Sequence, residues 1–398
     1  MNARRTSLLA AVVLGIAVLV SGPGQTLAAM DPGGIPHYFG PYPNWAYSPL
    51  PTGPVATVTV TAGGGGYSAA TTVDIVDIYG SGSGALALAT IDPVTGAITA
   101  IAVSNGGTGY TAPVVVITDN AGAGAVAEAT IGGALSGGIR KFVDNVPLLG
   151  PAGANNLGQY LPVAVADTAS FPGPNPPAAD YYEIALVEFM ERMHSDLPPT
   201  KHRGYVQLET PANFAVSNHV PMFNPDNTPI LMPDGVTQAI AVDNPHFLGP
   251  VIVATGSVPG QPGRPVRLKF YNLLSAGAGG ELFLPVDNTV MGAGPGPKDA
   301  MGMDCDPMAG MACEPYKQNR ATVHLHGNNT VWISDGTTHQ WITPAGESTP
   351  YPKGVSARNI PDMPDPGPGA ATFYYTNAQS ARLMFYHDHA MGITRLNV

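Results

Sequence analysis

Short runs of β-branched and other apolar residues, separated by glycine and proline, recur along most of the chain. Residues 57–60 (TVTV) alternate polar and apolar positions, and residues 114–117 (VVVI) are β-branched throughout. Further runs of this kind lie at 251–254, 266–272, 321–326, 372–376 and 383–386. Runs of about four to eight such residues, bounded by turn formers, are typical of β-strands. The pattern therefore predicts an all-β protein with many short strands.

Residues 180–194 (DYYEIALVEFMERMH) form one segment that is long enough for an α-helix. Tyr181, Ile184 and Val187 within it also suit a strand, because a continuous apolar run does not separate a buried strand from a helix. The following Pro198 ends the segment in either case. The sequence leaves both interpretations open.

An internal repeat marks residues 55–136 as a separate module. Gly63–Tyr67 (GGGGY) recurs as Gly106–Tyr110 (GGTGY), and Gly80–Ile91 recurs in similar form as Ala121–Ile131. We expect a small Gly-rich two-repeat β module, inserted ahead of the main domain. It offers no cluster of metal ligands and no nucleophile with a base, so spacing or adhesion is the expected role, with glycan or surface binding as the alternative.

Composition and charge narrow the range of functions. Only 11% of the 398 residues are charged, and the chain has 49 Gly and 41 Pro, which suits short strands joined by turns. The formal net charge is -11. Because nucleic acids are bound by basic surfaces, this balance argues against a nucleic acid partner.

The first residues are typical of an export signal. Arg4 and Arg5 precede an apolar stretch at 8–20, and small residues suited to cleavage end at Ala28 and Ala29. We expect a signal peptide at 1–29, an extended arm at 30–54, and a periplasmic or extracellular product. Sec and twin-arginine export both remain open. No later run is long and apolar enough to span a bilayer, so no membrane span is expected.

Two His-x-His pairs carry the candidate chemistry. His324 and His326 lie in one strand-like run, and His387 and His389 lie in another. Alternate residues of a strand share a face, so each pair can point its imidazoles at one metal. Imidazole suits copper, zinc, iron and nickel. The alternative is that these are satisfied core histidines or surface histidines.

The residues around both pairs resemble a known family. The motifs VHLHG (323–327), WISDG (332–336) and FYHDHAMGITRLNV (385–398) are similar to the first two copper motifs of multicopper oxidases, closest to the spore-coat laccase and bilirubin oxidase branch. Shorter matches follow the same order at KFVD (141–144), MHSDLPP (193–199), RPVR (264–267) and LPVD (284–287). The resemblance covers about 137–398 and implies a cupredoxin-like (plastocyanin-like) Greek-key β-sandwich.

The resemblance also implies roles for individual residues. His324 would bind a type 2 copper, and His326, His387 and His389 would bind the paired type 3 coppers. Asp335 would act as the catalytic acid that assists proton delivery to O2, with a simple turn residue as the alternative. Asp388 should point away from copper, either holding a neighbouring group or facing solvent.

The resemblance extends to the family's first cupredoxin domain and not to its C-terminal copper domain. We therefore expect 137–398 to be incomplete at its C-terminus, and the chain to be a fragment, a truncated product or half of a split enzyme. Further cupredoxin domains or a partner chain would complete it. Completed, it would oxidise a phenolic, pyrrolic or metal-ion reductant and reduce O2 to water. Alone, little or no oxidase activity is expected.

Other functions and sites remain open from the sequence. The alternatives are a non-enzymatic copper-binding or surface-attachment protein, and a zinc or iron site of another fold. Cys305 and Cys313 are expected to form a disulfide in an oxidising compartment. The methionines around them, Met301, Met303, Met308 and Met311, suit Cu(I) or belong to a flexible insertion. The remaining histidines are expected to be structural or at the surface: His37, His194, His202, His219, His246 and His339.

Overall fold

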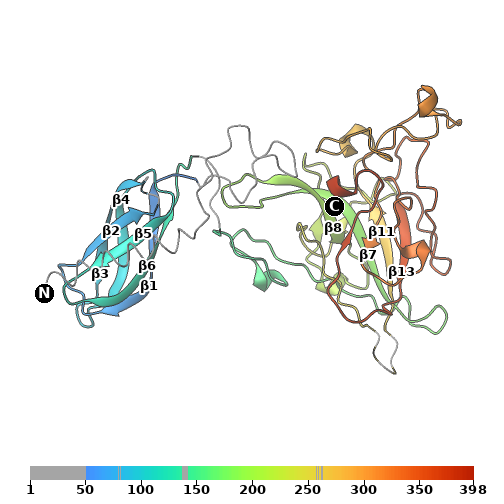
Figure 1. Cartoon of the computed structure of the whole chain (residues 1–398). Coiled ribbons are helices and arrows are strands. Elements are labelled where there is room, and N and C mark those ends of the chain that lie inside the picture. Colours follow the sequence, from blue (N-terminus) through green and yellow to red (C-terminus); the bar gives the residue numbers. More distant parts are fainter. Residues whose placement is uncertain are drawn as a thin grey trace. The chain divides into compact units, whose positions relative to one another are not determined.

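A computed structural model describes residues 51–398, except 79, 81, 137–141, 257, 259, 261 and 262. The predicted signal peptide and residues 30–50 of the predicted arm lie outside the described residues. The chain divides into two compact units, one ending at Lys141 and the other spanning Phe142–Val398. In the described residues the first unit consists of strands joined by turns, and the second of strands and 3-10 turns (Figure 1). The all-β class predicted from the sequence is confirmed. Within the described part of the chain, no helix has the length and apolarity to cross a membrane.

The first unit is built from the two predicted repeats. Its strands are β1 (Val55–Gly65), β2 (Thr72–Asp77), β3 (Ser83–Ile91), β4 (Ile98–Thr108), β5 (Pro113–Thr118) and β6 (Ala123–Ile131). They form one sheet of order β1-β6-β5-β2 and a β3-β4 pair. Because β1 pairs with β6 and β3 with β4, each repeat completes its pairing with strands of the other. This exchange explains why one repeat alone does not form the unit.

Tyrosines at equivalent positions of the two repeats form hydrogen bonds to the other repeat. Tyr67 of the first repeat accepts a hydrogen bond from the backbone of Ala125 in the second. Tyr110 of the second repeat accepts one from Ala85 in the first and donates to the Ile75 carbonyl. Both tyrosines are buried, with exposed fractions of 8% and 1%.

The extra hydrogen bond of Tyr110 gives a test of this exchange. Tyr110→Phe should destabilise the unit by about 1–3 kcal/mol, because it leaves the Ala85 N–H without its buried acceptor. Tyr67→Phe, the matched change in the other repeat, should cost less. Hydrogen–deuterium exchange of residues 51–136 in the full chain measures both. Equal or reversed effects would contradict the assigned pairing.

The second unit has a four-stranded main sheet. It contains β7 (Asp180–Glu191), β8 (Thr200–Gln207), β11 (Val266–Asn272) and β13 (Ala370–Tyr375) in the order β13-β11-β7-β8 (Figure 1). Strands β7 and β11 run parallel, whereas the other neighbours are antiparallel.

Asp180–Glu191 of the segment at 180–194 form a strand, so its interpretation as a helix is wrong. Ile184 and Leu186 of β7 point into one hydrophobic cluster, while Ala185, Val187 and Phe189 point into a second. A strand whose two faces are both buried loses the alternation of polar and apolar residues that identifies strands in a sequence.

Two-stranded pairs and 3-10 turns complete the unit. The pairs are β9 (Val220–Pro221) with β10 (Ile240–Ala241), and β12 (His324–Leu325) with β14 (Tyr386–His387). The 3-10 turns are η2 (Pro151–Gly153), η3 (Phe214–Val216), η4 (Gly277–Gly280), η5 (Pro307–Ala309), η6 (Trp332–Ser334) and η7 (Thr394–Leu396). The run at 251–254 was predicted to be a strand, but it contributes only an isolated bridge between Val251 and Val163.

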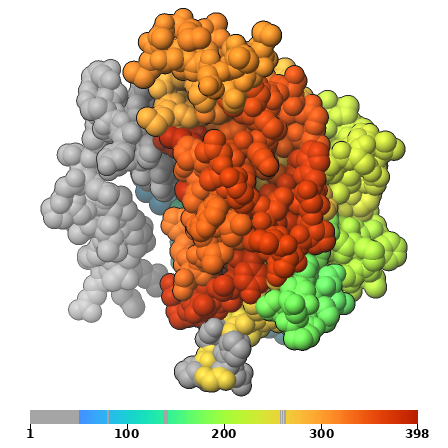
Figure 2. All heavy atoms as spheres, turned by 90° about the vertical axis from the view of Figure 1, so that its right-hand side faces the viewer, coloured from blue at the N-terminus to red at the C-terminus, as the bar shows by residue number. Residues whose placement is uncertain are grey.

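The histidine-bearing segments lie over one face of the main sheet. Val323 and the partly buried Leu325 and Tyr386 pack into the same cluster as Ile184 and Phe270 of the sheet. This second layer makes the unit a β-sandwich. Figure 2 shows that the last quarter of the chain, in red and deep orange, forms most of one face of this unit.

The predicted disulfide is present between Cys305 and Cys313, whose Cα atoms are 5.7 Å apart. It closes a loop at one margin of the unit, where orange atoms near residue 300 gather in Figure 2. The four methionines around it, Met301, Met303, Met308 and Met311, are all at least half exposed. The loop is therefore fixed at its base. The methionine side chains are largely exposed, although the sulfur of Met311 accepts a hydrogen bond from the backbone N–H of Asp306.

Candidate metal centre

Backbone pairing brings the two His-x-His motifs together. Strands β12 and β14 are antiparallel, and His324 lies directly opposite His387. Directly opposed residues of a strand pair have neighbouring side chains on the same face of the sheet. The apolar residues between and beside the ligands, Leu325 and Tyr386, pack on the core. Core packing on one face thus turns the imidazoles toward the other.

Four imidazoles meet at this point. His324, His326 and His387 each offer one ring nitrogen, and these atoms all lie within 4.8 Å of one another. His389 stacks on His324 with ring centroids 4.5 Å apart, and its centroid is 5.6 Å from that of His387. His326 is exposed and the other three are half-buried. The cluster is therefore open to solvent on one side.

Backbone carbonyls orient three of the rings. The Nδ1 atoms of His324, His387 and His389 lie within hydrogen-bond distance of the carbonyl oxygens of Asp335, Asp388 and Gly336, respectively. A ring that donates its Nδ1–H keeps Nε2 free as a metal ligand.

The fourth ring is oriented differently. His326 places Nδ1 3.3 Å from Nε2 of His387. Its Nδ1 has no carbonyl partner and faces the cluster. The first three rings instead direct Nδ1 at backbone carbonyls. The two nitrogens of the pair face one another, as ligands of a shared ion or of neighbouring ions would.

Burial favours the neutral form that metal binding requires. It lowers the pKa of His387, and repulsion from the neighbouring imidazoles of His324, His389 and His326 adds to that shift. Burial lowers the pKa of His389 in the same direction, again with His324 and His326 contributing. Because a metal competes with protons for imidazole, lower pKa values strengthen binding near neutral pH.

Asp388 ties the two ligand segments together. Its side chain is fully buried and accepts hydrogen bonds from the backbone N–H of Thr322 at 2.9 Å and of Ala390 at 3.1 Å. Thr322 precedes the first histidine pair, and Ala390 follows the second. Burial raises the pKa of Asp388 to about 6, although these hydrogen bonds and Arg320 oppose the shift. Of the two roles that the sequence left open for Asp388, it holds neighbouring groups and does not face solvent.

Asp335 lies beside the cluster. It ends turn η6, and a carboxylate oxygen lies 3.8 Å from Nδ1 of His324. Its side chain is 36% exposed. The carboxylate therefore contacts both the first histidine and solvent, whereas its backbone carbonyl orients the same ring.

Comparison of the sequence with known proteins indicates a family. No family model matches the chain. It is 27% identical over 262 residues to a laccase of Bacillus stratosphericus, covering 65% of this chain and 31% of the relative. It is 27% identical over 219 residues to a laccase of Bacillus subtilis (strain 168), covering 55% of this chain and 27% of the relative. These matches, over 55–65% of the chain, support membership of the multicopper oxidase family.

The chain spans less than a third of the length of those two laccases. A shorter stretch of 77 residues is 39% identical to Multicopper oxidase LPR1 homolog 1 of Oryza sativa subsp. japonica, covering 19% of this chain and 10% of the relative. A solved laccase from Pediococcus acidilactici Pa5930 matches with a TM-score of 0.26 and 14% identity, over 63% of this chain and 29% of that chain. The family assignment therefore rests on the sequence relatives. It implies copper as the metal, and the histidine cluster is compatible with copper.

Gly336 shapes this centre, and the sequence alone did not single it out. It has a positive φ of 68°, and a Cβ at this position would lie 1.9 Å from the carbonyl oxygen of Val323. Only glycine lets the turn approach the ligand strand closely enough for the carbonyls of Asp335 and Gly336 to reach His324 and His389.

Gly336→Ala should therefore weaken copper binding by roughly 10–100-fold, the usual effect of losing the groups that orient metal ligands. Gly327→Ala is the matched control, because Gly327 also has a positive φ but nothing lies within 4 Å of an added Cβ. Equilibrium dialysis against Cu(II) compares the two variants. If both lost the same affinity, backbone strain and not the close approach would be the cause.

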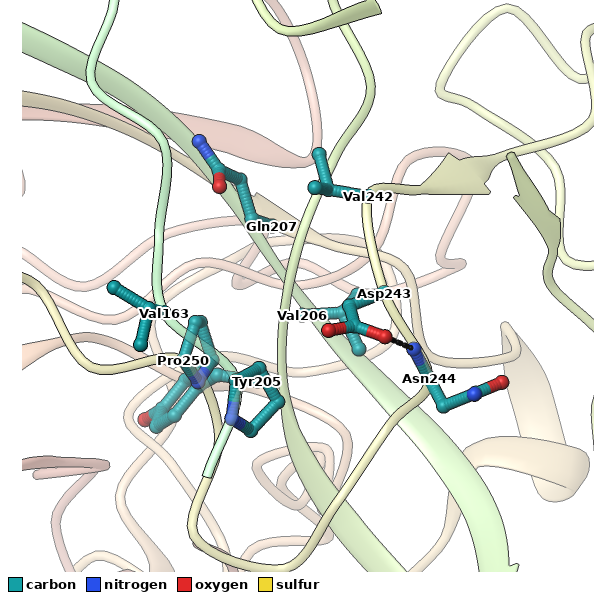
Figure 3. A pocket seen from close by; sticks show the side chains of 9 residues that line it. Val163, Tyr205, Val206, Gln207, Val242, Asp243, Asn244 and Pro250 are labelled. Atoms are coloured by element: carbon teal, nitrogen blue, oxygen red, sulfur yellow. Dashed lines mark hydrogen bonds between the residues drawn. The ribbon is translucent and has the colours of Figure 1, made fainter. Parts of the chain in front are cut away.

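The other histidines of the described residues lie outside the cluster. His194, His219 and His246 pair with Asp144, Glu209 and Glu191, respectively. His202 packs against aromatic rings, and His339 is exposed. His37 lies outside the described residues. A small cavity beside β8, lined by Tyr205 and Asp243 among others, has a volume of about 10 Å³ (Figure 3). That volume holds about one water molecule, so this cavity is too small for a substrate.

Proposed function

We propose that Phe142–Val398 is a copper-binding cupredoxin domain of an exported multicopper oxidase. The observation that carries the proposal is the register of β12 and β14, which sets His324 opposite His387. Two His-x-His pairs on adjacent strands bring four imidazoles together. In this proposal His324 binds a type 2 copper, and His326, His387 and His389 bind the type 3 pair.

The donor set fits copper. Imidazole nitrogen is a preferred ligand of copper, and carbonyl partners at Nδ1 leave Nε2 available on three rings. When bound, the copper cluster supplies the electron transfer that reduces O2 to water. The chain itself supplies the ligand geometry, through the core packing of Leu325 and Tyr386 and the tie made by Asp388.

Asp335 is proposed to move protons to this reaction. Its carboxylate is in contact with solvent and lies beside Nδ1 of His324. A carboxylate in that position can take protons from water and pass them toward the oxygen being reduced. Its backbone carbonyl keeps the His324 ring fixed while the carboxylate exchanges protons.

Electrons are proposed to enter through copper held by other cupredoxin domains, in the same polypeptide or in a partner chain. Those domains would also supply the remaining cluster ligands and the site for a phenolic, pyrrolic or metal-ion reductant. This chain alone is then expected to bind copper and to show little or no oxidase activity. Its site of action would be the periplasm or the extracellular space.

Metal binding and turnover test this proposal together. The metal-free chain is titrated with Cu(II), Zn(II) and Fe(II), and oxygen uptake with a phenolic reductant is followed with and without the completing domains. Preferred copper binding, with uptake only in the completed protein, is the expected result. One tightly held copper with no uptake in either case would support a non-enzymatic copper-binding or surface-attachment protein. Preferred zinc or iron binding would overturn the copper assignment.

A further inference from the structure

A buried arginine joins the main sheet to the segment that follows His389. Arg203 of β8 lies opposite Glu188 of β7, and its Nε donates to a Glu188 carboxylate oxygen at 3.0 Å. The guanidinium also donates to the side-chain oxygen of Asn397 at 3.0 Å. The Arg203 side chain is fully buried, and a buried charge is costly unless it is paired. The pair with Glu188 therefore holds the guanidinium in place and fixes one donor toward Asn397.

Asn397 connects this arginine to Asp388. Its side-chain oxygen accepts from Arg203. Its side-chain nitrogen donates to the carboxylate of Asp388 and, at 3.2 Å, to the carbonyl of Arg320. A guanidinium can only donate hydrogen bonds and an ionised carboxylate can only accept them, whereas an amide does both. The amide of Asn397 therefore satisfies two neighbours with opposite requirements.

Asp388 carries the connection on to both histidine pairs. Its carboxylate accepts from the backbone N–H groups of Thr322 and Ala390, and its own N–H donates to the Val398 carbonyl at 3.0 Å. The residues along this path are each at most 9% exposed: Glu188, Arg203, Asn397 and Asp388. Because water cannot readily replace a bond lost at such depth, removing one of these groups leaves its neighbours unpaired.

We propose that Asn397 is a positioning residue for the copper centre. By bonding Arg203 and Asp388 at once, it holds the two ligand segments at a fixed place on the main sheet. Copper affinity then depends on a side chain that lies outside the histidine cluster. The inference rests on the proposed copper function and deepens it, because it identifies the contact through which the sheet positions the ligands.

Asn397→Leu removes this contact at similar side-chain size, because leucine neither donates nor accepts a hydrogen bond. Asp388 then loses one of its donors, and the N–H groups of Thr322 and Ala390 are held less firmly. In the metal-free full chain, hydrogen–deuterium exchange of these two N–H groups should become roughly 10-fold faster, the effect of losing about one hydrogen bond. Unchanged exchange would overturn the proposal before any metal is added.

Asn213→Leu is the matched control for stability. Asn213 is 3% exposed, and its side chain accepts from the backbone N–H of Thr210 at 2.8 Å and donates to the Leu208 carbonyl at 3.0 Å. Its replacement also removes buried hydrogen bonds, so it should destabilise the second unit. It should leave exchange in the ligand segments and copper binding unchanged.

Copper binding supplies the second measurement. Equilibrium dialysis against Cu(II) should show an affinity about 10-fold weaker for Asn397→Leu, at the lower end of the effect of groups that orient metal ligands. Electron paramagnetic resonance should show an altered hyperfine splitting of the bound Cu(II), whereas Asn213→Leu should match the wild-type chain. If Asn397→Leu does not fold, Asn397→Ala removes the same bonds with a smaller side chain and takes its place.

The outcomes separate this proposal from the copper assignment. Wild-type copper affinity in the Asn397 variant, or an equal loss in Asn213→Leu, would overturn the positioning role and leave the copper assignment intact. A wild-type chain that binds no copper would overturn the proposed function and the positioning role together.

Discussion

Replacing His387 with alanine should lower the affinity of the chain for Cu(II) by more than about 100-fold. Losing a group that merely orients a ligand already costs roughly 10–100-fold, and His387 is at the middle of the cluster. It lies opposite His324 in the strand pair, and its Nε2 faces His326 at 3.3 Å. Equilibrium dialysis followed by copper analysis measures the loss.

The control for this change is His339→Ala. His339 is exposed and lies outside the cluster, so its removal should leave copper content unchanged. His326→Ala should behave like His387→Ala. A similar loss from all three variants would mean that copper binds through surface histidines in general, which would contradict the assigned ligands.

Replacing Asp388 with asparagine should lower both stability and copper affinity. The carboxylate accepts from two backbone N–H groups in a fully buried position. An amide offers one oxygen and places its NH2 against the other donor, which should reduce the free energy of unfolding by about 1–3 kcal/mol. Because the Asp388 carboxylate would no longer connect Thr322 and Ala390 through both hydrogen bonds, the ligand segments would be less well positioned. Copper affinity should therefore fall by roughly 10–100-fold.

Chemical denaturation and copper dialysis separate the two effects of Asp388→Asn. Asp304→Asn makes the same chemical change on an exposed loop and should alter neither quantity. A variant that lost stability but kept full copper affinity would show that the buried carboxylate supports the fold without positioning the ligands.

Much of the ligand set was predictable from spacing. Period two in a strand puts His324 with His326 on one face, and the structure has both in the cluster. The pairing of His324 with His387 was not predictable in the same way, because register between residues far apart in sequence depends on packing and not on local pattern. The resemblance to a known family supplied that link.

Burial explains the main error in the fold. Residues 184–187 (IALV) form an unbroken apolar run because β7 contacts a cluster on each face. Such a run matches a helix as well as a strand until its neighbours are known. The repeats at 55–136 were visible in the sequence, but the exchange of strands between them was not.

A cavity beside His246 had no signal in the sequence. Its lining comes from separate segments around residues 142–161, 191–194 and 246–248. His246 taken alone is typical of a structural histidine, and its pairing with Glu191 agrees with that interpretation.

Diffraction from copper-soaked crystals, recorded at the copper absorption edge, tests the central claim most directly. The account predicts anomalous peaks within coordination distance of the ring nitrogens of His324, His326, His387 and His389. Copper located instead at the exposed methionines around Cys305 and Cys313, with no peak between β12 and β14, would contradict it.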